Sequence, residues 1–130
     1  MLIYGDGEQT RAFSYIDDCL EPLWNAAMLP EASKEIINLG GEYATSINEA
    51  ARVLCEVTGV NNIKYCEERE EVKHAVPTCQ KSKDILKYSG TTSLKEGLTE
   101  MWKWAQKQPN RPQYKWDNYE IEKDIYSYWK

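Results

Sequence analysis

The sequence lacks several features that would identify common protein classes. No apolar run approaches the ~20 residues that a membrane-spanning helix requires. There is one histidine, and the four cysteines form no CxxC pair and have no histidine at a zinc-ligand spacing. We therefore expect no metal site. Because no signal-peptide pattern is present either, we expect free thiols and a cytoplasmic location.

Glycine-rich phosphate-binding turns are also missing. None of the seven glycines belongs to a GxGxxG or GxxGxxG pattern. In dinucleotide-binding folds, such a turn joins a strand to a helix and lets backbone amides approach the pyrophosphate. We therefore expect this chain to bind no dinucleotide cofactor by itself.

The charge balance limits the possible partners. The chain has 130 residues, 42% of them hydrophobic, a net charge of −5 and an isoelectric point near 5.0. The length and composition suit one small globular domain. Nucleic acids and anionic membranes need a clustered positive surface, so neither is an expected partner.

Hydrophobic periodicity and turn residues predict an α/β fold, with a small sheet of short strands and about four helices. Glycines at positions 5 and 7 predict a tight reversal between the first two strands. The expected strands cover residues 2–4, 11–16, 35–39 and 62–66.

Capping residues mark where the helices begin. Ser46 and Ser93 each open a capping box, and Gly59 ends the helix that follows Ser46. Asp17 or Asp18 is expected to cap a helix that runs to about residue 28, with a proline near its first turn. Thr78 is expected to cap a short helix before residue 87.

A change of composition divides the chain into two parts. Residues 1–108 read as one domain, whereas prolines and a high density of aromatic residues characterise 109–130. This tail is too apolar for a disordered segment. We expect it to form a short helix from about residue 118 to 128, and to dock on its own domain or on a partner.

Two segments carry a family resemblance. Residues 3–18 read IYGDGEQTRAFSYIDD, and residues 86–98 read LKYSGTTSLKEGL. They resemble the patterns IYGDGxQTRDFxYVDD and LGWxPxxSLEEGL of the extended short-chain dehydrogenases that act on nucleotide sugars. The resemblance covers residues 2 to about 107 and is to the C-terminal, substrate-binding part of such enzymes. It implies that the NAD-binding and catalytic residues of the family lie upstream of Met1.

The resemblance also implies a substrate site. Arg11 and Arg69 match the two arginines that bind the nucleotide diphosphate in the family, and Tyr4 matches a residue of the base and ribose pocket. Guanidinium groups suit this role because they form paired, charge-assisted hydrogen bonds to phosphate. Other interpretations remain open. Arg11 could pair with Glu8 or Asp17, Arg69 could pair with its acidic neighbours, and Tyr4 could be a packing residue.

Two departures from the family pattern concern the same site. Ala12 stands where the pattern usually has aspartate, so this chain lacks a carboxylate that would orient the arginine or contact the sugar. After Arg69 the sequence reads EEVKHA, where the broader family has a Gly-Asp pair and one more residue.

No catalytic residue is expected. A family-like Tyr-x-x-x-Lys spelling, Tyr119 with Lys123, lies in the tail and has no serine or threonine partner. His74 has no nucleophile at a recognisable spacing. Asp17 and Asp18 are better explained by helix capping than by acid–base chemistry.

These observations favour the substrate-binding portion of an NAD-dependent nucleotide-sugar epimerase or dehydratase, which is not catalytic alone. The alternative is a stand-alone binding or oligomerisation module. It could dock on a separate Rossmann-domain chain or associate with itself as a homo-oligomer, since segments that pack on the cofactor domain would otherwise expose apolar surface.

Overall fold

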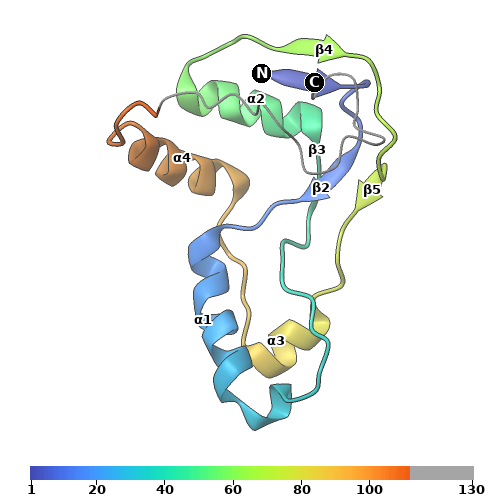
Figure 1. The fold of residues 1–130 in the computed structure, drawn as a ribbon, viewed down its shortest axis with the longest axis vertical. Coiled ribbons are helices and arrows are strands. Elements are labelled where there is room, and N and C mark those ends of the chain that lie inside the picture. The colour runs from blue at the N-terminus through green and yellow to red at the C-terminus, as the bar shows by residue number, and fades with distance from the viewer. Residues whose placement is uncertain (112–130) are drawn as a thin grey trace, which may run out of the picture.

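The computed structural model describes residues 1–111, which form short strands and helices in an elongated arrangement (Figure 1). In chain order these elements are β1 (Leu2–Tyr4), β2 (Thr10–Ala12), α1 (Ile16–Met28), the 3-10 helix η1 (Pro30–Ala32), β3 (Ala44–Ser46), α2 (Ile47–Thr58), β4 (Lys64–Cys66), β5 (His74–Ala75), α3 (Gln80–Leu86) and α4 (Leu94–Ala105). The predicted α/β class, with a small sheet and four helices, is confirmed. The predicted tail helix lies outside the described residues.

The short strands form two small sheets, one of two strands and one of three. β1 pairs in parallel with β4, and its partner residues run from Leu2↔Lys64 to Tyr4↔Cys66. β2 is the middle strand of the second sheet, antiparallel to β3 and parallel to β5. The positive φ values predicted for the turn at Gly5 and Gly7 are confirmed, at 77° each, but β1 and β2 do not pair with each other across it. Each strand pairs with a segment much later in the chain.

The helices pack in two groups, at opposite ends of the molecule. α2 packs on α4, near the β1–β4 pair, and α1 packs on α3 and η1 (Figure 1). β2 and the loops on either side of it connect the two ends. The buried apolar residues follow this division: Ile3, Ala51 and Val53 belong to the first group, and Ala32, Cys79, Leu86 and Tyr88 to the second.

Two predicted helix starts and one predicted end are confirmed. The Ser46 side chain accepts a hydrogen bond from the Glu49 amide at 3.1 Å, and the Ser93–Glu96 capping box of α4 is complete. Hydrogen bonds from the Ser93 side chain and backbone lower the pKa of the Glu96 carboxyl. Gly59 ends α2 with a φ of 71°, a left-handed conformation that glycine adopts without a steric penalty.

The other two predicted caps are wrong. α1 begins after Tyr15, which makes no side-chain cap, and α3 begins after Cys79 rather than Thr78. The Asp18 carboxylate instead accepts hydrogen bonds from the backbone amide and the hydroxyl of Thr92, at 3.0 and 2.9 Å. It thereby fixes the loop that leads into α4 against the first turn of α1. Pro22 lies further inside α1 than expected, where it is buried.

The predicted strand at 35–39 is also wrong. Residues 35–39 have no regular secondary structure, and the Ile36 side chain is 89% exposed. A β-strand needs a neighbour to supply its backbone hydrogen bonds, so a β-rich sequence alone does not form one. Within residues 1–111, no strand lies beside this segment. No helix of these residues is both long enough and apolar enough to cross a membrane.

Candidate functional site

Strand pairing brings the three predicted site residues together. Tyr4 ends β1 and pairs with Cys66, so the chain that leaves β4 returns past the tyrosine. The Arg69 guanidinium stacks on the Tyr4 ring, with its Cζ atom 3.2 Å from the ring centroid. Arg11 lies on β2 and pairs with Ala75 of β5, the strand that follows the loop after β4. The loop between β4 and β5 is thus the common wall of the site.

A small pocket of about 50 Å³ lies at this point. It is lined by Tyr4, Gly5, Asp6, Gln9, Glu68, Arg69, Glu71 and Lys73. The lining contains two cations and three carboxylates, and the Arg11 side chain reaches it through an ion pair with Glu71. Both signs of charge are therefore present at this pocket.

The partners of Arg11 differ from those considered from the sequence. Its Nη2 atom lies 2.7 Å from Oε2 of Glu71, so the ion pair is formed with Glu71 rather than with Glu8 or Asp17. Its Nη1 atom donates to the Thr10 carbonyl at 2.8 Å and to the Lys73 carbonyl at 3.5 Å. The guanidinium is consequently hydrogen-bonded to both β2 and the β4–β5 loop.

Gln9 links this ion pair to the tyrosine. Its Nε2 atom donates to the other Glu71 oxygen, Oε1, at 3.1 Å and to the Tyr4 carbonyl at 2.9 Å. Sequence reasoning identified neither Gln9 nor Glu71 as a site residue. The glutamine belongs to the opening motif, two residues before the arginine, but the glutamate is 60 residues away from Arg11.

The ion pair is only partly shielded from solvent. The side chains of Arg11 and Glu71 are 28% and 37% exposed. Pairs with this exposure contribute about 0–1 kcal/mol to stability. The Arg11–Glu71 contact is therefore weak enough to be exchanged for a contact with a ligand.

His74 takes part in strand pairing rather than in this pocket. It faces Thr10 across the β2–β5 pair, and its Nδ1 atom lies 2.9 Å from the threonine hydroxyl. No group of three or more histidine, cysteine or acidic side chains in residues 1–111 is arranged to hold a metal ion.

The turn after β1 does not fit a dinucleotide. Gly5 and Gly7 both have a φ of 77°, but the turn leads to β2 and not to a helix whose N-terminus could face a pyrophosphate. The Asn48 side chain fills the space above Gly7, where it donates to the Asp6 carbonyl.

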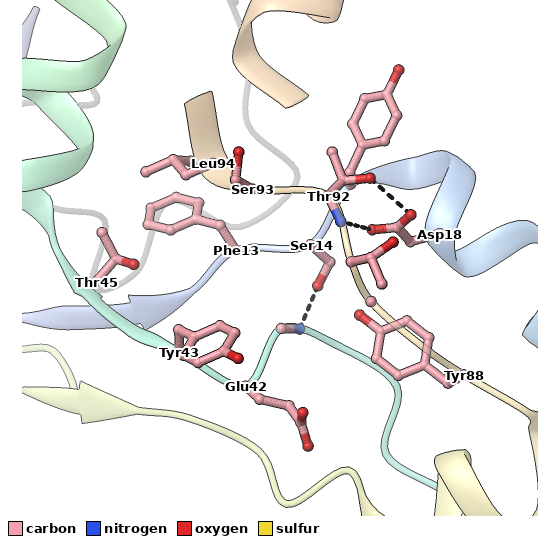
Figure 2. Close-up of a pocket in the computed structure, with 14 residues that line it drawn as sticks. Phe13, Ser14, Asp18, Glu42, Tyr43, Thr45, Tyr88, Thr92, Ser93 and Leu94 are labelled. Carbon is pink, nitrogen blue, oxygen red and sulfur yellow. Dashed lines mark hydrogen bonds between the residues drawn. The ribbon is translucent and has the colours of Figure 1, made fainter. Parts of the chain in front are cut away.

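A larger cavity of about 240 Å³ lies where α1, the loop before β3 and the loop before α4 meet (Figure 2). The Ser14 hydroxyl accepts a hydrogen bond from the Gly41 amide at 2.7 Å, and the Asp18–Thr92 contact forms another part of the wall (Figure 2). Burial raises the pKa of the Tyr88 phenol, which also faces this cavity. Arg11, Arg69 and Tyr4 are not among its lining residues.

Comparison with known proteins gives consistent relatives. No family model matches the sequence. The UDP-N-acetyl-alpha-D-glucosaminuronate decarboxylase of Bacillus cytotoxicus is 33% identical over 112 residues, which cover 80% of this chain and 35% of that protein. The UDP-glucuronate 4-epimerase of Thermodesulfobacterium geofontis is 34% identical over 106 residues, 79% of this chain and 32% of that protein.

Solved structures agree with these relatives. The UDP-glucuronic acid 4-epimerase of Bacillus cereus, in complex with UDP-glucuronic acid and NAD, superposes with a TM-score of 0.73 at 31% identity. The match covers 81% of this chain and 34% of that one. This chain thus spans about a third of the length of the relatives it matches. About 80% of this chain is thus similar, in sequence and in fold, to nucleotide-sugar enzymes of the extended short-chain dehydrogenase/reductase family.

Proposed function

We propose that this chain is the substrate-binding portion of an NAD-dependent nucleotide-sugar epimerase or dehydratase, and that it holds the nucleotide diphosphate. The observation that carries the proposal is the convergence of Tyr4, Arg11 and Arg69 around one loop. Residues 1–108 would form the binding domain. The portion of such an enzyme that this chain does not match would bind NAD and carry out hydride transfer, so we expect no turnover by this chain alone.

Each site residue has a role that suits its surroundings. Arg11 and Arg69 would bind phosphate oxygens through charge-assisted hydrogen bonds. The Tyr4 ring would support the guanidinium of Arg69 through the cation–π contact, and would also form a side of the base and ribose pocket. This arrangement orders one arginine before the ligand arrives, which reduces the entropy cost of binding.

Replacing Arg11 with alanine tests the proposal. One hydrogen bond to a charged group contributes roughly 1.5–3 kcal/mol. We therefore expect the Arg11→Ala variant to bind UDP-glucose about 10- to 150-fold more weakly than the unmodified chain, as measured by isothermal titration calorimetry. The matched control is Arg52→Ala, which removes an exposed arginine of α2 whose partner is Glu56. Equal affinities of the Arg11 variant and the control would contradict the proposed diphosphate site. NAD reduction by the pure chain would contradict a different expectation, that the chain has no turnover alone.

A second candidate function is supported by the apolar surface of α1. Its exposed large side chains have 54–66% of their surface accessible: Ile16, Leu20, Leu23, Trp24 and Met28. Ile36, in the segment after η1, is even more exposed. Contiguous apolar surface of this kind marks interfaces. The chain would then serve as an assembly module, docked on a separate Rossmann-domain chain or on a second copy of itself.

A charged substitution on α1 distinguishes association with a second copy from docking on a separate chain. If the chain associates with itself through this surface, light scattering should show a mass that rises with concentration, and Trp24→Glu should abolish the rise. Trp104→Glu, which places the same charge at an exposed tryptophan of α4, should not. A monomer across a wide concentration range would rule out the homo-oligomer and leave the separate chain as the remaining partner.

A further inference from the structure

We propose that Glu71 competes with the ligand at the diphosphate site: its carboxylate holds the Arg11 guanidinium and has to leave before phosphate oxygens can bind. This inference rests on the proposed function, because it assigns a regulatory role to a residue of the same site. It explains why the site contains a carboxylate in direct contact with a cation that is expected to bind an anionic ligand.

The hydrogen bonds of Arg11 show which of its partners can be exchanged. Nη1 donates to two backbone carbonyls, which are fixed by the pairing of β2 and by the path of the β4–β5 loop. Nη2 donates to the Glu71 carboxylate, a side chain that can rotate away. A ligand that displaces Glu71 gains Nη2 and leaves the strand undisturbed.

The Glu71 carboxylate also imitates a phosphate group in its contacts. One oxygen accepts from Arg11 at 2.7 Å, and the other accepts from Gln9 at 3.1 Å. A phosphate group could likewise accept hydrogen bonds from both side chains, because it has two or more free oxygens. Gln9 is therefore a second donor that becomes available when Glu71 leaves.

The surroundings of Glu71 make its departure inexpensive. Asp6 and Glu68 line the same pocket, so Glu71 adds a third carboxylate there. Like charges close together repel one another, and solvent already reaches more than a third of the Glu71 side chain. An incoming diphosphate would also be repelled by this negative charge. Removal of the Glu71 charge should therefore favour binding for two reasons: it releases Arg11, and it removes this repulsion.

A different role for Glu71 makes the opposite prediction. If the carboxylate stayed in place and accepted hydrogen bonds from a sugar hydroxyl of the ligand, its removal would weaken the binding of a nucleotide sugar. Inorganic pyrophosphate has no sugar hydroxyl. A comparison of pyrophosphate with UDP-glucose therefore separates the two roles.

The test is a calorimetric titration of the full chain with each of these two ligands. Glu71→Gln keeps the shape of the side chain and removes its charge, and we expect it to bind both ligands roughly two- to fivefold more tightly, the range that an exposed ion pair can supply. Glu70→Gln is the matched control, since it removes the adjacent charge in the same loop, and it should produce a smaller gain. In an Arg11→Ala background the gain from Glu71→Gln should disappear.

The binding results distinguish competition by Glu71 from the hydroxyl-accepting role. Tighter binding of both ligands by Glu71→Gln, dependent on Arg11, supports competition. Unchanged or weaker binding of pyrophosphate overturns the competition proposal. Weaker binding of UDP-glucose but not of pyrophosphate supports instead the role in which Glu71 accepts a hydrogen bond from a sugar hydroxyl. If neither ligand binds to any of the variants or to the unmodified chain, the proposed diphosphate site itself fails. Circular dichroism spectra that match across the set confirm that the substitutions leave the fold intact.

Discussion

Replacing Ile3 with alanine should lower the free energy of unfolding by about 2–5 kcal/mol. The Ile3 side chain is only 1% exposed, and it is among the largest fully buried side chains of the described residues. It lies in the middle of β1, at the end of the molecule where α2 and α4 pack together. Urea denaturation followed by tryptophan fluorescence measures the change, because Trp102 and Trp104 belong to α4.

The sequence contains a matched control for this substitution. Ile36→Ala removes the same atoms from a side chain that is 89% exposed, so the free energy of unfolding should change by less than about 0.5 kcal/mol. A small effect at Ile3, or an effect at Ile36 as large as that at Ile3, would contradict the packing described for β1.

Gly41→Ala should have the second largest effect. A Cβ atom at this position would lie 2.2 Å from the backbone oxygen of Phe13, far closer than atoms can approach. The backbone of Phe13 follows β2 directly, so relief of the clash requires a shift of the strand that carries Arg11. Overpacking of this kind costs about 1–3 kcal/mol. We expect a loss near 3 kcal/mol in thermal or urea unfolding, because a backbone atom yields less easily than a side chain.

The adjacent glycine is the control for this effect. A Cβ atom on Gly40 would meet its nearest neighbours, Pro77 Cγ and Ser14 Oγ, at 3.4 and 3.5 Å, which is close to ordinary contact. Gly40→Ala should therefore leave the free energy of unfolding within about 1 kcal/mol of the unmodified chain. If the two variants were equally stable, the close approach between residues 13 and 41 would not exist in solution.

Features with local causes were predictable from the sequence. The Ser93–Glu96 capping box needs only four consecutive residues, and the end of α2 needs only a glycine that accepts a positive φ. β1 and β4 were also recognised, because their alternation and turn residues are local. These signals are independent of what the rest of the chain does.

Features that depend on distant partners were not predictable. Asp18 has the chemistry of a helix cap, but its carboxylate bonds to Thr92, 74 residues later. The β-rich segment at 35–39 would need a neighbouring strand, and residues 1–111 place none beside it. In both cases the residues have the local preference on which the prediction rested, but contacts with distant segments determine the structure.

The candidate site divides in the same way. The family resemblance predicted Tyr4, Arg11 and Arg69; Tyr4 and Arg69 line one small pocket, and Arg11 contacts the Glu71 side chain of its lining. It did not identify the partner of Arg11. Glu71 belongs to a run of four glutamates between residues 67 and 71, and nothing in their order shows which one lies closest to Arg11.

The parallel pairing of β1 with β4 has a consequence for how the chain folds during its synthesis. Leu2 pairs with Lys64, so β1 must wait for some 62 further residues before its partner strand exists. At roughly 5–20 residues per second, translation takes about 3–12 s to provide it. During this interval residues 2–4 lack the partner that gives them their strand conformation, so the β1–β4 sheet forms only after residue 66 has been synthesised.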